Sequence, residues 1–363
     1  MKKYTKEELS LIWLDSFMGL EYKHKVQIYK SLVSSDKISE GLNNAKDYII
    51  SSAGENQYKT MLSSANQSYL DFVLDELDRK EIEAVTICSG SYPKSLSDIE
   101  LKPLVLYAKG NLELLQSQCF AIVGSRKSLP LSISIAKDYA TSLSKHFTLV
   151  TGIAEGVDSE VILAALSTTK NVISVVSGGF DNIYPSTNKD LFEKVCSCGL
   201  AISEQPPKIA PKPYFFPIRN RIIAGLSKGV LVVSAGVKSG TLYTAEYANE
   251  YSKDLFAVPY SIGVASGAGT NDLIKRGALL TDKPNDILDF YSLESGEKEI
   301  DLTLEEKEII KVLSNGAMHI EKISNALGKR TFEMLTKLSV LELKGVIVKS
   351  GNVYGLARNY SED

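Results

Sequence analysis

The sequence predicts an α/β protein with a doubly wound, mainly parallel sheet, flanked by an N-terminal helical module and a C-terminal winged helix. Three observations lead to this prediction. Apolar residues repeat at helical spacing over residues 1–84, short apolar runs alternate with helical segments through most of 85–291, and three helices with a hairpin fill 302–363. A chain of 363 residues is longer than one hydrophobic core usually serves, so these parts are expected to be separate domains.

The first part shows helical periodicity without strand signals. Its apolar residues fall into three segments, made of Leu9, Ile12, Trp13 and Phe17, of Val26, Tyr29, Leu32 and Val33, and of Tyr69, Phe72, Val73 and Leu77. Positions three and four apart share one face of a helix. We therefore expect a small helical module that packs or interacts rather than one that performs catalysis.

Six short apolar runs in the second part predict the strands of the sheet. They cover 119–123, 148–151, 172–176, 200–203, 229–234 and 255–259, and segments of helical length separate them. Such continuous apolarity indicates parallel strands that are buried on both faces and joined by helical crossovers. A sheet of this kind binds its ligands beyond the carboxyl ends of the strands.

The last part follows a polar stretch, 292–301, that is typical of a linker. Thr303 and Glu306 have the spacing of a capping box at the start of a first helix. A second helix is expected over about 319–327, a third over Thr331–Lys344, and two short strands around the turn Ser350-Gly351-Asn352. This order is that of a winged helix, a variant of helix-turn-helix.

Composition and charge exclude several classes of protein. No apolar run approaches the ~20 residues of a membrane span, and the segment after MKKYTKEELS is amphipathic, unlike a signal peptide. Cys88, Cys119, Cys196 and Cys198 fit no disulfide framework, and no histidine stands beside the last two to complete a metal site, so we expect reduced thiols in a cytoplasmic protein. A net charge of -3 argues against coating nucleic acid with the whole surface but allows a local basic site.

Small-residue loops follow four of the predicted strands. They contain Gly124-Ser125-Arg126, Gly152, Gly178-Gly179 and Lys238-Ser239-Gly240-Thr241. Glycine lets a backbone approach an anion closely, and helix N-termini present unpaired N–H groups. Because these loops meet at one edge of a parallel sheet, they predict a phosphate or nucleotide pocket. The glycine fingerprint of dinucleotide-binding proteins and the Walker lysine motif are absent, so we expect neither NAD nor hydrolysed ATP, and no cofactor.

The segment from Gln205 to Gly240 concentrates positive charge in an acidic protein. It has no Asp or Glu, and its cations are Lys208, Lys212, Arg219, Arg221, Lys228 and Lys238. Aromatic residues at 214–216 lie among them, which suits single-stranded nucleic acid because rings stack on unpaired bases while cations meet phosphates. An equally open alternative pairs Arg219 and Arg221 with carboxylates such as Asp158 or Glu204 and places the rings in the core.

Over about 85–290 the chain resembles the DprA/Smf family, the DNA-processing protein A of bacterial natural transformation. The resemblance is carried by YPKSLSDIELKPLVLYAKGN, AIVGSRK, TGIAEGVD, IYPSTN, SEQPP, FPIRNRIIAGLSKGVLVV, KSGTLYTAEYA and GTNDLIKRGALL, in this order. The flanking parts resemble the layout of some members, with a SAM- or HhH-like helical module first and a winged helix last.

This resemblance implies a Rossmann-like domain that binds and protects incoming single-stranded DNA without catalysis, forms a homodimer and loads the RecA recombinase during recombination. It implies that Arg126 and Lys212 contact the DNA backbone and that Phe216 packs near a base. Arg219, Asn220 and Arg221 would shape the pocket, and Gly124, Ser125 and the loop Lys238–Thr241 would supply donors. The chain departs from common members at Glu155, Ile162 and Ser234, where a basic residue, a histidine and a glutamate are frequent.

Two other classes of protein stay as alternatives. An enzyme of the related nucleotide-hydrolysing proteins would need a catalytic glutamate close behind a GGxGT loop, whereas the next acid after Thr241 is Glu246, in a predicted helix body. A winged-helix regulator would read duplex DNA with its third helix. That helix offers Lys329, Arg330, Lys337 and Lys344, opposed by Glu333 and Glu342.

Overall fold

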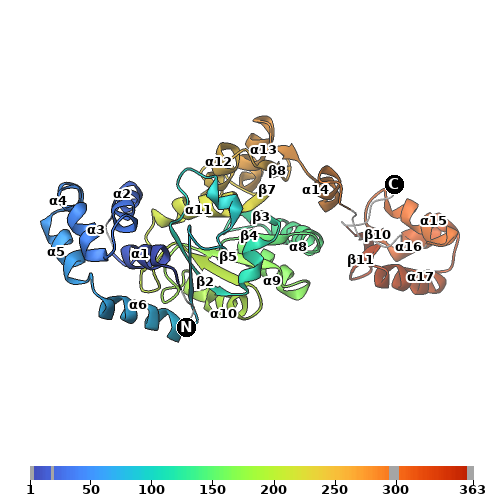
Figure 1. The fold of residues 1–363 in the computed structure, drawn as a ribbon. Coiled ribbons are helices and arrows are strands. Elements are labelled where there is room, and N and C mark those ends of the chain that lie inside the picture. Colours follow the sequence, from blue (N-terminus) through green and yellow to red (C-terminus); the bar gives the residue numbers. More distant parts are fainter. Residues whose placement is uncertain (1–3, 18–19, 294–301, 358–363) are drawn as a thin grey trace. The chain divides into compact units, whose positions relative to one another are not determined.

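The computed structural model describes residues 4–17, 20–293 and 302–357, and the chain forms two compact units, Met1–Thr281 and Asp282–Asp363. The first contains the helical part and a nine-stranded sheet, and the second a small three-stranded sheet with helices (Figure 1). The predicted fold class is confirmed. The predicted boundary at residues 84 and 85 falls inside the first strand of the large sheet, β1 (Glu83–Thr86). In the described ranges, no helix combines the length and apolar character that a membrane crossing requires.

The large sheet has the strand order β1-β2-β6-β5-β4-β3-β7-β8-β9. Neighbours from β6 to β9 pair in parallel, whereas β2 is antiparallel to both β1 and β6. The strands are β2 (Val105–Gly110), β3 (Cys119–Gly124), β4 (Thr148–Thr151), β5 (Val172–Val176), β6 (Leu200–Ser203), β7 (Ser227–Ser234), β8 (Asp254–Ala257) and β9 (Leu279–Leu280). All six predicted strands are confirmed. The strands β1, β2 and β9 were not predicted from the sequence. β1 and β2 form an antiparallel pair without a long helical crossover, and β9 has only two residues, both exposed.

The connections place helices on both faces of this sheet. From β3 to β6 the chain winds outward through α8 (Pro130–Leu143), α9 (Val157–Ser167) and α10 (Lys189–Cys198). Helix α11 (Phe215–Leu226) then crosses the opposite face of the sheet and leads into β7, which pairs with β3. Helices α12 (Leu242–Glu250) and α13 (Ala268–Lys275) follow β7 and β8 on the same face as α11. The winding direction therefore reverses between β3 and β7, and open α/β sheets bind ligands at such a switch point.

The helical part packs against the edge of the sheet and belongs to the same unit. Its helices are α1 (Lys6–Asp15), α2 (Tyr22–Val33), α3 (Ile38–Asn44), α4 (Lys46–Ala53), α5 (Glu55–Ser63) and α6 (Gln67–Arg79), and α7 (Lys94–Ser97) follows β1. Buried Tyr107 of β2 donates a hydrogen bond to Asp15 Oδ2 at 3.0 Å, and Lys25 Nζ lies 2.6 Å from Oδ1. Burial and the negative charge of Asp15 raise the pKa of the Tyr107 hydroxyl well above its ordinary value. A short polar network thus fixes the first two helices on the sheet.

The second unit begins with α14 (Pro284–Phe290), which was predicted as part of 85–291. The predicted winged-helix order follows, with α15 (Leu304–Leu313), β10 (Met318–His319), α16 (Ile320–Leu327), α17 (Thr331–Leu343), β11 (Ile347–Ser350) and β12 (Val353–Leu356). The capping box is present: the Glu306 amide donates to Thr303 Oγ1 at 3.3 Å, and the Thr303 amide donates to Glu306 Oε2 at 2.8 Å. Gly351, at φ +62°, makes the turn between the last two strands, where a side chain would be strained. Most of the predicted linker, 294–301, lies outside the described residues.

A buried ion pair fixes helix α11 to the end of β6. Arg221 is 3% exposed, and its Nη2 donates to Glu204 Oε1 at 2.5 Å. Its Nη1 approaches the Ile218 carbonyl at 3.4 Å, and its Nε has no hydrogen-bond partner among the described residues. A guanidinium withdrawn from water depends on its charge partner, because the desolvation cost is otherwise uncompensated. The pair with Glu204 therefore anchors α11 at the end of β6.

We expect Arg221→Ala to lower the free energy of unfolding by about 3 kcal/mol, because it leaves the Glu204 carboxylate unpaired at a mostly buried position. Urea unfolding followed by circular dichroism measures this loss. Arg276→Ala is the matched control, since Arg276 makes an exposed pair with Asp272 at 2.8 Å and its loss should cost less than about 1 kcal/mol. Equal and small losses in the two variants would show that the buried pair does not hold the helix.

Candidate functional site

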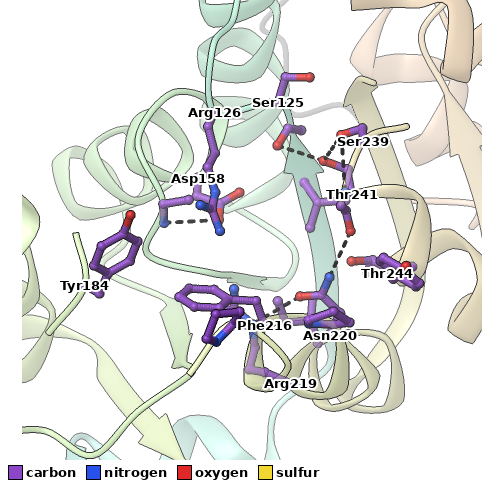
Figure 2. Close-up of a pocket in the computed structure, with 18 of the residues that line it drawn as sticks. Ser125, Arg126, Asp158, Tyr184, Phe216, Arg219, Asn220, Ser239, Thr241 and Thr244 are labelled. Atoms are coloured by element: carbon purple, nitrogen blue, oxygen red, sulfur yellow. Dashed lines mark hydrogen bonds between the residues drawn. The ribbon is translucent and has the colours of Figure 1, made fainter. Parts of the chain in front are cut away.

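A cavity of about 840 Å³ opens at the switch point, beyond the carboxyl ends of β3, β4 and β7 (Figure 2). Its walls come from the loop after β3, the start of α9, one side of α11 and the loop that enters α12. Nine predicted site residues line it: Gly124, Ser125, Arg126, Phe216, Arg219, Asn220, Ser239, Gly240 and Thr241. The volume suits a ligand of nucleotide size.

One wall of the cavity combines an exposed cation with two aromatic rings. The Arg126 guanidinium carbon lies 5.0 Å from the centroid of the Phe216 ring, a cation–π distance. The Tyr184 ring meets Phe216 edge to face, with centroids 5.7 Å apart. A small adjoining hollow of about 50 Å³ lies among these three side chains, with Glu155 on its lining. Figure 2 shows Tyr184 on the side of the cavity where Phe216 lies. The wall offers both a flat apolar surface and a positive charge.

The floor of the cavity holds a buried arginine. Arg219 is 8% exposed; its Nη1 donates to the Val175 carbonyl at the end of β5, and its Nε donates to Asn220 Oδ1 at 3.1 Å. Burial lowers the pKa of Arg219 to about 10, against the opposing effect of nearby Asp158, so the guanidinium stays charged at neutral pH. Burial likewise raises the pKa of Asp158, which the Arg219 charge opposes. The two groups offset each other's charge at the floor.

The loops after β3 and β7 are tied together by their own hydrogen bonds. The Ser125 amide donates to Ser234 Oγ at 3.2 Å, and the Thr241 hydroxyl donates to the Gly124 carbonyl at 3.0 Å. Asn220 Nδ2 donates to the Gly240 carbonyl at 3.2 Å. Several predicted donors are therefore engaged within the protein, and these bonds hold the two loops in register around the cavity.

Three predicted glycines do not line the cavity, and close packing explains why they are glycine. A Cβ on Gly152 would lie 2.4 Å from Asp158 Oδ2 and 2.8 Å from Arg219 Nη2, so this glycine makes room for the floor pair. A Cβ on Gly178 or Gly179 would collide with the backbone of residues 206–211. The Gly179 amide already donates to the Ile209 carbonyl at 2.7 Å and is not directed at a ligand.

The basic residues of 205–240 divide into two groups. Arg221 points into the core, as the alternative with Glu204 predicted, and Lys208 Nζ contacts Glu76 of α6 at 2.8 Å. Lys212 and Lys238 are exposed and do not line the cavity, although Lys238 adjoins Ser239, which does. Lys212 Nζ lies 5.9 Å from the ring centroids of both Tyr214 and Phe215. In the part of the chain that the structure describes, neither lysine makes an ion pair, and the same holds for Arg126 and Lys127 at the cavity.

Several residues that line the cavity were not predicted from the sequence. Tyr184 stands in IYPSTN, a stretch that carries the family resemblance, but nothing in its spacing indicates that it reaches Phe216. Lys127, Tyr243 and Thr244 also line the cavity, and Asp158 was expected there only as an ion-pair partner. Glu246, the acid considered for an enzyme, is exposed on α12 and does not line the cavity.

Known proteins share both the sequence and the architecture of this chain. The family described as DNA recombination-mediator protein A matches residues 83–292. The DNA processing protein DprA of Streptococcus pneumoniae is 37% identical over 209 residues, which cover 58% of this chain and 74% of that protein. Protein Smf of Escherichia coli is 33% identical over 277 residues, which cover 71% of this chain and 73% of that protein.

Two solved structures extend this similarity to the fold. DNA processing protein A from S. pneumoniae matches with a TM-score of 0.68 at 29% identity, covering 79% of this chain and 98% of that one. DNA processing protein A from Helicobacter pylori, described for its single-stranded DNA binding mode, matches with a TM-score of 0.54 at 28% identity, covering 58% of this chain and 96% of that one. The sequence motifs, the switch-point fold and these matches agree, and the chain belongs to the DprA/Smf family of DNA recombination-mediator proteins.

Proposed function

We propose that this protein binds single-stranded DNA in the switch-point cavity, protects incoming strands and loads a RecA recombinase onto them, without catalysing a reaction. The observation that carries the proposal is the wall where Arg126 stacks on Phe216 beside Tyr184. A base that is not paired in a duplex can enter the cavity and stack on such rings, while its phosphates meet the guanidinium. Bases inside a duplex are already stacked and cannot reach the floor.

The charge around the cavity supports the same ligand. Arg126, Lys127, Lys212 and Lys238 are exposed and make no ion pair within the described ranges. Unpaired cations around an opening attract a polyanion and release its counterions. The protein as a whole carries a net charge of -3, so the attraction is local and directs the strand to this opening.

Membership in a recombination-mediator family supports the recombinase as a partner and a homodimer as the working form. The H. pylori relative is described for its single-stranded DNA binding mode, which supports single-stranded rather than duplex DNA as the ligand.

The chemistry of the cavity supports a role without catalysis. Among the described residues that line the cavity, Asp158 is the one with a carboxylate. It is buried beside Arg219 and accepts a hydrogen bond from the Ala154 amide at 3.3 Å. It is therefore poorly placed to activate a nucleophile.

Replacing Arg126 by alanine should weaken single-stranded DNA binding by about 1–3 kcal/mol, because both a phosphate contact and the stacking partner of Phe216 are lost. Fluorescence anisotropy of a labelled oligonucleotide across a salt series measures this. The slope of log affinity against log salt should become shallower by roughly 0.7. Arg79→Ala removes one exposed charge on α6 and serves as the control. An Arg126→Ala protein that binds like the control would place the DNA elsewhere.

Phe216→Ala should lower the affinity for single-stranded DNA by about 1–3 kcal/mol while the salt slope stays nearly the same, because a ring contributes stacking rather than charge. Phe216→Trp, which keeps a stacking surface, should bind close to the unchanged protein. The same anisotropy titrations, repeated with duplex DNA as a competitor, measure the affinity of both variants for single-stranded DNA. If Phe216→Ala lowered both the affinity and the salt slope to the extent expected for Arg126→Ala, the ring would serve only to position Arg126.

A further inference from the structure

The small hollow beside the cavity contains an acidic side chain next to the proposed DNA site. Glu155, in the loop before α9, lines the hollow together with Arg126, Tyr184 and Phe216. It is exposed and makes no ion pair among the described residues. A carboxylate repels phosphates, so Glu155 opposes the strand that the neighbouring cations attract. A DNA strand gains from this side chain only through groups that donate hydrogen bonds, and these are the N–H groups of its bases.

A hydrogen bond holds the Glu155 carboxylate in place. The Thr187 hydroxyl donates to Glu155 Oε1 at 2.8 Å, and Oε2 has no hydrogen-bond partner among the described residues. Asn188 Nδ2 donates to the Ile153 carbonyl at 2.8 Å, so the loop that carries Glu155 is tied to the turn that follows Tyr184. The carboxylate is therefore oriented before a ligand arrives, and it keeps acceptor positions on both oxygens.

The size and lining of the hollow suit the edge of one nucleobase. Its volume of about 50 Å³ holds a few water molecules, whereas the adjoining cavity of about 840 Å³ takes a whole nucleotide. A base that stacks beside Phe216 in the cavity therefore directs one edge toward Glu155. Donors line the hollow as well. Arg126 makes no ion pair among the described residues, and the hydroxyl of buried Ser177 has no hydrogen-bond partner there.

We propose that the small hollow recognises guanine, so that single-stranded DNA is bound with a guanine beside Phe216. This inference rests on the proposed function. Guanine is the DNA base whose Watson–Crick edge offers two adjacent donors, N1–H and N2–H, which match the two oxygens of one carboxylate. Its O6, on the same edge, accepts from a donor beside Glu155 such as Arg126. Adenine and cytosine offer one donor next to an acceptor, and thymine offers one donor between two acceptors.

Competition binding with short strands tests this preference in the full chain. Each strand consists of thymine around one central guanine, adenine or hypoxanthine, and it displaces a labelled thymine oligonucleotide in fluorescence anisotropy. The guanine strand should bind about fivefold or more tighter than the adenine strand, which controls for the stacking of a purine. Hypoxanthine lacks the 2-amino group, so its strand should bind close to the adenine strand. Equal affinities for the guanine and adenine strands would overturn the proposal.

A matched pair of variants tests whether the Glu155 carboxylate recognises the base. Glu155→Gln should bring the affinities for the guanine and adenine strands within about twofold of each other, because its amide presents one acceptor and one donor instead of two acceptors. Glu160→Gln removes a carboxylate from the first turn of α9, outside the hollow, and should keep the preference. A guanine preference that survives in Glu155→Gln would overturn the proposal.

Glu155→Arg separates recognition from charge. The affinity for an all-thymine strand should rise, because the new cation attracts phosphates, while the guanine preference should disappear, because a guanidinium donates hydrogen bonds but does not accept them. A preference that persists in this variant would overturn the proposal. Failure of the proposed function has a different signature, since no strand would then bind tightly. Failure of this inference alone leaves tight binding without a preference among bases.

Discussion

Two buried arginines on helix α11, each bound to its own partner on the sheet, determine the geometry of the candidate site. Arg221 is held by Glu204 at the end of β6, and Arg219 by the Val175 carbonyl at the end of β5. Both arginine residues are less than 10% exposed, and a buried cation is stable only where its partners are in place. These contacts fix the rotation of α11, and that rotation presents Phe216 and Asn220 to the cavity. The site depends on this helix more than on any single loop.

Electrostatics then divides the basic residues by role. Cations that pair inside the molecule, such as Arg221 and Lys208, connect segments that are far apart in the chain. Cations without partners stand around the opening, where Arg126 also stacks on Phe216. An acidic protein can in this way attract a polyanion to one place, because the cations at the opening act together. In the winged helix the same kind of pairing holds Lys329 and Lys337 on Glu305 and Lys344 on Glu306.

The sequence was sufficient for the parts of the fold that depend on local pattern. Six apolar runs predicted the six central strands, and the spacing of Thr303 and Glu306 predicted the start of α15. Features set by tertiary packing could not be read in this way. Arg219 and Arg221 are two positions apart and point about 200° apart around α11, so which one lines the cavity depends on how the helix is rotated. Similarly, Gly178 and Gly179 look like an anion loop in sequence, yet the segment 206–211 packs against them.

Hydrogen exchange of the full chain with and without a short single-stranded oligonucleotide tests the central claim most directly, because it reports on every backbone amide at once. The account predicts slower exchange in the loops at 124–127 and 239–244 and in the first turns of α9 and α11, with the winged-helix unit unchanged. Slower exchange confined to α17 and the strands β11 and β12, with the switch-point loops unaffected, would contradict it.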